Sequence, residues 1–186
     1  MRWLIALVGV LALAGCSAGK DAVATGSEFV FVSPNGKTDI FYDGSDRKNI
    51  PDLSGDSLLE DGKKIKISDF ADRIVVLNIW GSWCPPCRVE APELQKVHDS
   101  GATVLGIDVH DQQRSAPQDF VRDRNLSYPS IYDPPGRSLL ALKGYPRATV
   151  PSTIVLDRQH RVAAVYLRDL LATDLLPVVE RLAAEA

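Results

Sequence analysis

Residues 74–80 form an almost continuously apolar run that is rich in β-branched side chains. Such a run is typical of a strand buried on both faces, which places it near the centre of a sheet. Residues 103–109 have the same character, and the segment between the two runs predicts a helix over 85–99. A strand, a helix and a second strand in this order predict a right-handed βαβ unit, and with it an α/β fold.

Shorter strand-like segments precede this unit. Residues 29–32 and 40–42 flank an Asn-Gly turn signal at 35–36, which predicts an N-terminal hairpin extension over 29–50. A second short hairpin is expected around the Asp-Gly pair at 61–62. Both segments would add strands to the edges of the sheet.

The C-terminal half continues the alternation of helices and strands. Residues 115–125 and 136–143 predict helices, and 152–156 with 162–167 predict an antiparallel strand pair. The last helix is expected to be capped by Thr173. Together these segments predict a mixed central β-sheet flanked by helices on both of its faces.

The composition is that of an ordinary globular protein. Of the 186 residues, 45% are hydrophobic and 24% are charged, which fits one compact domain and excludes a disordered or collagen-like chain. The 21 basic and 24 acidic residues leave a net charge of −3. Nucleic-acid binding needs a clustered positive surface, so no nucleic-acid partner is expected.

The N-terminus has the features of an export signal. A basic start precedes an apolar stretch over 4–14, which is shorter than the about 20 residues that span a bilayer. Residues 13–16 resemble the bacterial lipobox, in which a cysteine, here Cys16, carries the lipid. A buried helix with a core cysteine and a signal peptide cut elsewhere are the alternatives. We expect a lipoprotein signal peptide over 1–15, a tether over 16–28 and anchoring at the extracytoplasmic face of the bacterial cytoplasmic membrane.

The other two of the three cysteines indicate redox chemistry. Cys84 and Cys87 are separated by two residues at the expected junction of strand and helix. The free N–H groups and the dipole of a helix N-terminus favour a thiolate, so Cys84 is the expected nucleophile. Cys87 can then resolve a mixed disulfide by attacking the Cys84 sulfur. One alternative is half of a zinc site, but the sequence has no second pair of ligands. Another is a structural disulfide, but it would close only a short loop and would add little stability.

Residues 76–87, which end in the motif Trp-Cys-Pro-Pro-Cys, resemble the active-site strand and helix of the thioredoxin superfamily. They are most similar to its TlpA-like branch, which includes ResA and CcmG (DsbE), membrane-tethered reductants of cytochrome c maturation. Residues 128–143 resemble the insert of that branch, and 150–157 resemble its segment with a cis-proline. The resemblance covers 51–186 and implies a thioredoxin-like domain over those residues.

This resemblance implies roles for individual side chains. Glu90, on the same helical face as Cys87, is expected to point inward, to have a raised pKa and to act as the acid and base of the exchange. The alternative is an exposed helix glutamate. Asn78 stands where thioredoxin has a titrating aspartate. Trp83 is expected to shield Cys84.

The resemblance also implies a substrate-binding edge at Val150 and Pro151. Pro151 is expected to be cis, and the backbone of Val150 is expected to offer hydrogen bonds to a bound substrate chain. A trans proline at the start of a strand is the alternative. The loop over 144–151 is longer than is usual in the family, so we expect a different substrate specificity.

Pro85 and Pro86 bear on the direction of electron flow. Neither residue has a backbone N–H, so the turn offers a Cys84 thiolate few hydrogen-bond donors. A poorly stabilised thiolate gives up its electrons readily, which suits a reductant.

These features predict a lipid-anchored thiol-disulfide oxidoreductase with no cofactor beyond the redox-active disulfide of Cys84 and Cys87. The resemblance implies that it reduces the haem-binding cysteines of apocytochrome c and receives electrons from a CcdA-like membrane thiol transporter. A disulfide oxidase or isomerase for exported proteins is the main alternative. A binding or chaperone module and a peroxidase are further alternatives. The presence of both cysteines, Glu90 and Pro151 argues against a binding or chaperone module. A peroxidase would be expected to have a lone reactive cysteine and not a pair.

Overall fold

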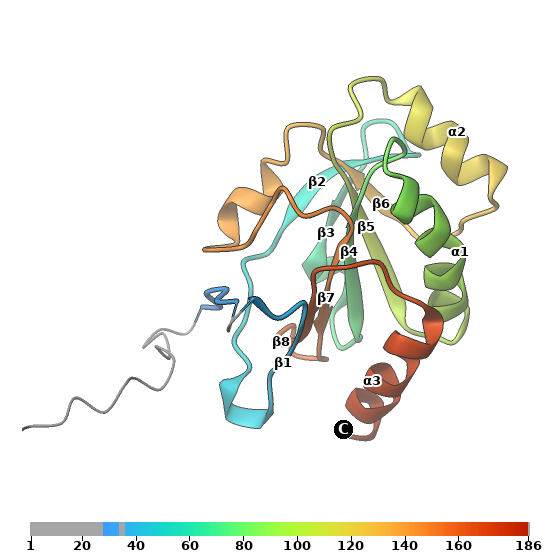
Figure 1. The fold of residues 1–186 in the computed structure, drawn as a ribbon. Helices are drawn as coiled ribbons and strands as arrows, with labels where there is room; N and C mark the ends of the chain where they lie inside the picture. The colour runs from blue at the N-terminus through green and yellow to red at the C-terminus, as the bar shows by residue number, and fades with distance from the viewer. Residues whose placement is uncertain (1–27, 34–35, 186) are drawn as a thin grey trace, which may run out of the picture.

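The computed structural model describes residues 28–33 and 36–185 (Figure 1). The strands are β1 (Asp39–Phe41), β2 (Ser54–Ser57), β3 (Lys64–Lys66), β4 (Val75–Trp80), β5 (Thr103–Asp108), β6 (Ser130–Tyr132), β7 (Ser152–Leu156) and β8 (Val162–Tyr166). The helices are α1 (Pro85–Asp99), α2 (Ser115–Asp123), α3 (Ala172–Ala184) and the short 3-10 helices η2 (Gly44–Asp46), η3 (Ile67–Phe70) and η4 (Ser138–Ala141). The strands form one sheet in the order β1-β8-β7-β4-β5-β6-β2-β3.

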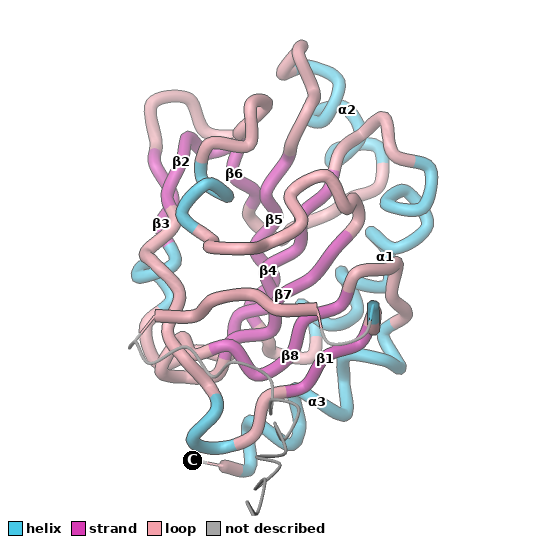
Figure 2. Tube along the Cα trace, turned by 60° about the vertical axis from the view of Figure 1, so that its left-hand side comes forward, coloured by secondary structure: helices cyan, strands magenta, loops and turns pink. Residues whose placement is uncertain are grey.

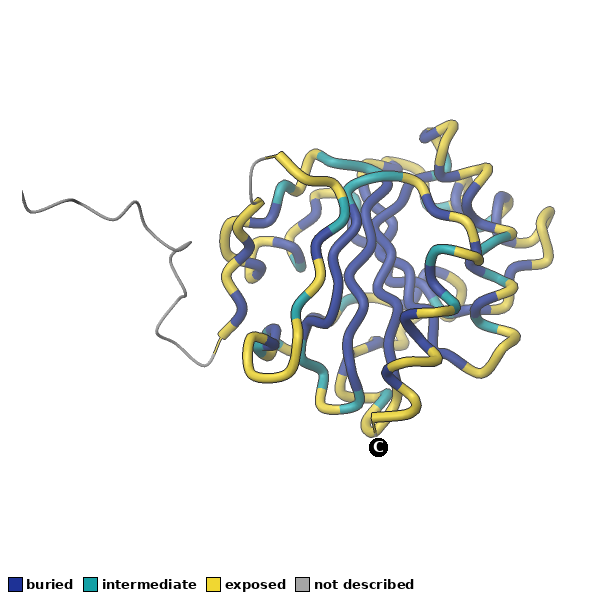
Figure 3. The backbone as a smooth tube through the Cα atoms, turned by 60° about the horizontal axis from the view of Figure 1, so that its bottom comes forward, coloured by how far each residue is buried: buried dark blue, intermediate teal, exposed yellow. Residues whose placement is uncertain are grey.

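β4 and β5 lie at the centre of this sheet, as their apolar sequences predicted. Every residue of both strands is buried, and Figure 3 shows the central strands as a continuous buried layer. The two strands pair in parallel and are connected by α1, which confirms the βαβ unit. β7 lies on the other side of β4 (Figure 2). It pairs with β4 antiparallel, so the sheet is mixed.

The two faces of the sheet are covered differently. Side chains alternate along β4, so Val76 and Trp80 belong to one core, whereas Leu77 and Ile79 belong to the other. All three α-helices close the first core from the same side of the sheet (Figure 1). The second core is closed by the N-terminal segment, η3 and η4. We expected helices on both faces of the sheet. Among the described residues, the second face is covered only by 3-10 helices and has no α-helix.

The predicted helix over 136–143 is reduced to η4. Gly136 and Gly144, at the two ends of that segment, have φ values of 63° and 73°, which interrupt a right-handed helix. The hairpin predicted around 61–62 is confirmed, because β2 and β3 pair antiparallel on either side of it.

The N-terminal hairpin prediction is wrong in its pairing. β1 pairs antiparallel with β8 at the edge of the sheet, and not with residues 29–32. The N–H groups of Phe29 and Phe31 donate to the carbonyls of Asn49 and Lys143, and both rings are buried in the second core. β1 pairs with β8 because an edge strand has unpaired backbone N–H and C=O groups. Phe29 and Phe31 do not pair with β1, because their rings are buried in the second core. The segment expected to be an extension therefore belongs to the same sheet and core as the rest.

The cap of the last helix also differs from the prediction. α3 begins at Ala172, with Leu171 as its N-cap residue, so Thr173 lies inside the first turn. The carboxylate of Asp174 accepts the N–H of Leu171 at 2.8 Å and satisfies a donor at the helix start. A carboxylate in the first turn also suits the helix dipole.

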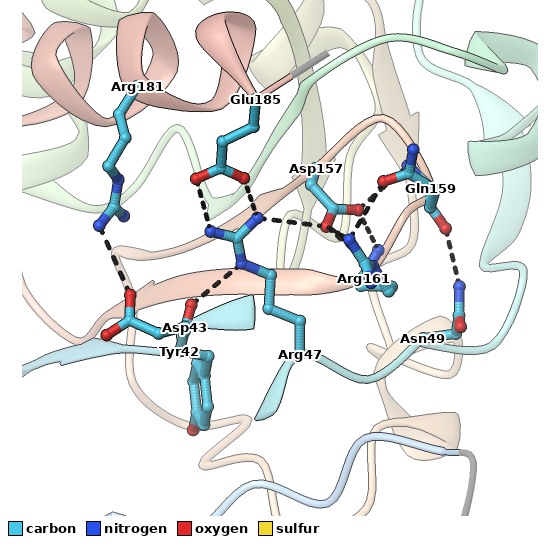
Figure 4. Close-up of polar contacts among 9 residues, drawn as sticks. All are labelled: Tyr42, Asp43, Arg47, Asn49, Asp157, Gln159, Arg161, Arg181 and Glu185. Atoms are coloured by element: carbon cyan, nitrogen blue, oxygen red, sulfur yellow. Dashed lines mark hydrogen bonds and ion pairs between the residues drawn. The ribbon is translucent and has the colours of Figure 1, made fainter. Parts of the chain in front are cut away.

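A buried arginine ties the N-terminal segment to the C-terminal end of the chain (Figure 4). The Arg47 side chain is 3% exposed and pairs with Glu185 through two hydrogen bonds of 2.5 and 2.9 Å. It also reaches Asp157 at 3.4 Å and donates to the Tyr42 carbonyl at 3.0 Å. Asp157 in turn accepts a hydrogen bond from Arg161 at 2.9 Å. The network joins the turn between β7 and β8, the segment after β1 and the residue that follows α3 in one charge-paired cluster.

Residues 1–27 lie outside the described part of the chain, and with them the predicted signal peptide, most of the tether and Cys16. Within the described part, none of the helices combines the length and the apolar character needed to cross a bilayer.

We expect Arg47→Ala to lower the free energy of unfolding by about 2 to 3 kcal/mol, because it removes the charge-assisted hydrogen bonds to Glu185 and Asp157 and the donor to the Tyr42 carbonyl. Urea unfolding measures the change. Arg122→Ala is the matched control, since Arg122 pairs with Asp119 at the surface and such pairs contribute less than about 1 kcal/mol. Equal losses in the two variants would contradict a special role for the Arg47 cluster.

Candidate active site

The two cysteines lie where the sequence placed them, at the start of α1. Cys84 is the N-cap residue of this helix and forms a disulfide with Cys87. The N–H of Cys87 donates to the Cys84 sulfur at 3.2 Å. Pro85 and Pro86 occupy the first two helical positions and have no N–H to offer. The Cys84 sulfur is therefore at a helix N-terminus, but with a reduced set of backbone donors.

Glu90 points into the protein, as predicted, and not toward solvent. Its residue is 1% exposed, and each carboxylate oxygen accepts one hydrogen bond. The Asn78 amide donates to Oε2 at 3.3 Å, and the Leu170 N–H donates to Oε1 at 3.2 Å. Burial raises the pKa of Glu90 to about 8, although both hydrogen bonds and the charge of Arg168 act in the opposite direction. At neutral pH the carboxyl group therefore carries a proton for most of the time.

A pKa near 8 suits a group that exchanges protons with a thiol. The unperturbed pKa of cysteine is about 8.5, so a proton can pass between a thiol and such a carboxyl in either direction at little cost. Glu90 occupies the helical position three residues after Cys87, so the two residues share one face of α1. This arrangement can supply and remove protons next to the cysteine pair.

Asn78 orients this carboxyl group. Its amide nitrogen donates to Glu90 and also to the hydroxyl of Thr153, at 3.1 Å. Asn78 and Thr153 are register partners on β4 and β7. The amide is therefore held by a neighbouring strand and by Glu90 on α1. An aspartate here, as in thioredoxin, would place two acids together, whereas the amide donates to the one acid present.

The Val150–Pro151 peptide bond is cis, which confirms the expected conformation. Pro151 is buried and directly precedes β7, where Ser152 is opposite Ile79 of β4. Pro151 therefore lies at the end of the sheet from which the chain enters the cysteine turn. The expected contact of Val150 with a substrate chain stays a prediction.

The two tryptophans of the motif have different environments. Trp83 is 50% exposed, its indole N–H donates to the Val109 carbonyl at 2.9 Å, and its ring lies beside His110. Shielding of the sulfur by Trp83 stays a prediction. Trp80 is buried against Phe120, so its role is packing.

Two acids were not singled out from the sequence, Asp108 at the end of β5 and Asp111 in the loop that follows it. Asp108 is fully buried, and Asp111 accepts two hydrogen bonds from Ser82, which lies in the cysteine turn. Polar residues at the carboxyl end of a central parallel strand are a usual sign of a functional site, and this signal was available. No three potential ligands gather into a metal site within residues 28–33 and 36–185.

Glu90 generates a testable pH dependence. The folded protein keeps a proton on Glu90 that the unfolded chain releases above its ordinary pKa of 4.5, until the pH passes about 8. Stability therefore falls as the pH rises through this window, by up to about 1.4 kcal/mol per pH unit. We expect Glu90→Gln to make this decline shallower but not to abolish it, because Asp108, whose pKa is raised to about 10, also keeps a proton that the unfolded chain releases. Urea unfolding at about pH 5 and about pH 8 would measure both slopes.

Glu93→Gln is the matched control on the same helix. A hydrogen bond from Lys96 lowers the pKa of Glu93, so this residue is charged throughout the window and contributes no slope. If wild type and Glu90→Gln lose stability in parallel as the pH rises, Glu90 does not hold the proton.

Comparison with known families places the chain among sequence relatives. The AhpC/TSA family matches residues 47–165. ResA of Bacillus thuringiensis subsp. konkukian, named a thiol-disulfide oxidoreductase, is 30% identical over 106 residues, which cover 55% of this chain but only 59% of that protein. DsbE of Vibrio cholerae, named a thiol:disulfide interchange protein, is 31% identical over 145 residues and covers 75% of this chain and 76% of its own.

A solved structure extends the comparison to nearly the whole described fold. A secreted thiol-disulfide isomerase from Corynebacterium glutamicum is 50% identical, with a TM-score of 0.82, and the match covers 84% of this chain and 98% of that one. The shared fold is thioredoxin-like, as the sequence motifs implied. The chain therefore belongs to the AhpC/TSA family, and its relatives there include the ResA and DsbE proteins of the thioredoxin superfamily.

Proposed function

We propose that this protein catalyses thiol-disulfide exchange with disulfides of other proteins, in the direction of reduction and outside the cytoplasm. The observation that carries the proposal is the Cys84–Cys87 disulfide at the start of α1, with the carboxyl of Glu90 buried on the same helix face. The names of the relatives, which are thiol-disulfide oxidoreductases and interchange proteins, support the same chemistry.

The exchange uses two displacement steps. In the reduced protein the Cys84 thiolate attacks one sulfur of the substrate disulfide, and the other substrate sulfur leaves as a thiolate that takes up the proton of Glu90. Cys87 then loses its proton to the carboxylate of Glu90 and attacks the Cys84 sulfur. This step breaks the mixed disulfide and releases the second substrate thiolate. Two electrons have passed to the substrate, and the protein is left with its own disulfide.

The direction of transfer follows from the donors around Cys84. Only Cys87, among the first three residues of α1, has an N–H to donate, because the other two are Pro85 and Pro86. A thiolate with few donors is less stable, so the reduced pair gives up electrons more easily. We therefore favour a reductant over a disulfide donor.

The proposed substrate is the haem-binding cysteine pair of apocytochrome c, whose thiols must be free before haem attaches. We further propose that a CcdA-like membrane thiol transporter returns electrons to the pair and that a lipid on Cys16 holds the protein at the membrane. The relation to ResA and DsbE supports the substrate. The lipobox-like residues 13–16 support the anchor.

Disulfide isomerisation or oxidation of exported proteins is the second candidate. The observation that favours it is the 50% identity to the secreted thiol-disulfide isomerase from Corynebacterium glutamicum. Both candidates use the same cysteines, so the reduction potential and the captured substrates distinguish them.

We expect a reduction potential below about −200 mV, against about −120 mV for a strong dithiol oxidant. Equilibration with glutathione buffers measures it. Pro86→Ala adds an N–H beside the Cys84 sulfur and should make the potential less negative, which tests the stated cause. A wild-type value close to about −120 mV would contradict the reductant and support the second candidate.

We expect a reduced Cys87→Ser variant to remain linked to its substrate, because the mixed disulfide on Cys84 can no longer be resolved. The full chain would be incubated with membranes, and the captured proteins identified. Cys84→Ser is the matched control and should capture nothing. Recovery of c-type cytochromes supports the proposed substrate, a broad set of secreted proteins supports isomerisation, and no adduct would contradict cysteine exchange altogether.

A further inference from the structure

The loop that follows β5 holds the turn that carries the nucleophile. Three consecutive residues, Val109, His110 and Asp111, contact the two residues that precede Cys84. The Trp83 indole donates to the Val109 carbonyl at 2.9 Å, and its ring centroid lies 6.1 Å from that of His110. Both loops lie at the upper end of the sheet in Figure 1.

Asp111 makes the most specific of these contacts. The Ser82 N–H donates to its Oδ2 at 2.7 Å, and the Ser82 hydroxyl donates to its Oδ1 at 2.6 Å. Asp111 is only 7% exposed, so water competes little for these charge-assisted bonds. The hydroxyl of Tyr132 on β6 donates to the Asp111 carbonyl at 2.9 Å, which fixes the loop from its other side.

Ser82 is the residue through which this contact reaches the nucleophile. The Cys84 N–H donates to the Gly81 carbonyl at 3.2 Å, so residues 81–84 form a closed turn with Ser82 in its middle. A carboxylate that holds both the backbone and the side chain of Ser82 therefore limits how far the turn can move.

Asp108 is a second carboxyl near this contact, and no hydrogen bond joins it to Ser82. Asp108 is fully buried, and neither of its carboxyl oxygens has a hydrogen-bond partner among the described residues. Burial and the nearby carboxyls of Asp111 and Asp133 raise the pKa of Asp108 to about 10, so it is neutral at physiological pH. Asp111, whose two oxygens both accept, is the acceptor that holds Ser82.

We propose that Asp111 is a positioning residue: it holds Ser82 so that the Cys84 sulfur stays at the N-terminus of α1. This inference rests on the proposed function only in requiring a reactive Cys84. Without the restraint the turn can move the sulfur away from the Cys87 N–H and from the helix dipole. The thiolate then loses part of its stabilisation and reacts more slowly at neutral pH.

The test is the pH profile for alkylation of the reduced protein by iodoacetamide, which reports the titration midpoint of Cys84 without any protein substrate. Asp111→Asn removes the charge but keeps an oxygen for the Ser82 N–H and an amide for its hydroxyl. Asp111→Ala removes charge and contacts together. We expect the Ala midpoint to lie about one pH unit above the Asn midpoint, which makes alkylation near neutral pH about tenfold slower.

Asp52→Ala is the matched control. The Asp52 carboxylate accepts the N–H and the hydroxyl of Ser68 at 2.9 and 2.8 Å, the same pattern in the segment that precedes β4. This variant should leave the midpoint unchanged even if it lowers stability. Equal midpoints for the Ala and Asn variants of Asp111, or an equal shift in Asp52→Ala, would overturn the proposal.

Ser82→Ala provides a second route if Asp111→Ala does not fold. It deletes the hydroxyl bond and keeps the backbone bond to Asp111. We expect a rise in the midpoint smaller than that described for Asp111→Ala, and no rise would overturn the proposal. Because the probe is a small alkylating reagent, this result is independent of whether cytochromes or other proteins are captured by Cys87→Ser.

Discussion

The complete burial of β4 is the constraint on which the site depends. A strand with both faces covered can lie only at the centre of the sheet, so its carboxyl end emerges between two other strands. The chain leaves this end through the turn over 81–84 and enters α1 with Cys84 as its N-cap residue. β7 brings Pro151 to the same end, and β5 brings Asp111. The redox centre therefore lies at the carboxyl end of β4, in the middle of the sheet.

Two buried acids on this face of the sheet have opposite environments. Glu90 has a hydrogen-bond donor at each oxygen, and its pKa is raised only into the range in which thiols titrate. Asp108 has no such donor among the described residues and lies near other carboxyls, so its pKa rises further. The first acid can exchange protons at neutral pH, whereas the second is held neutral. Burial raises both pKa values, and the donors to Glu90 together with the acids beside Asp108 separate them.

The N-terminal segment is part of the domain and not an appendage to it. β1 extends the sheet at the β8 edge, and Phe29 and Phe31 fill the second core. Arg47 pairs with Asp157 in the turn between β7 and β8 and with Glu185 directly after α3. The site lies at the opposite end of β4 from Asp157, so this cluster stabilises the scaffold without touching the cysteines.

The sequence alone determined the features that depend on local pattern. The apolar runs predicted β4 and β5, the spacing of Cys84 and Cys87 predicted a reactive pair at a helix start, and the position of Glu90 three residues later predicted its inward face. Where a prediction was wrong, as for the 29–50 hairpin, the partner came from a distant strand.

Tertiary structure alone decided which distant groups meet. The donors to Glu90 come from Asn78 and Leu170, and the acceptor for Ser82 comes from Asp111. Such pairs have no sequence signature, because their separation along the chain is set by which faces of the sheet and helices pack together. Local pattern therefore specifies the reactive atoms, and packing specifies the groups that hold them and set their pKa values.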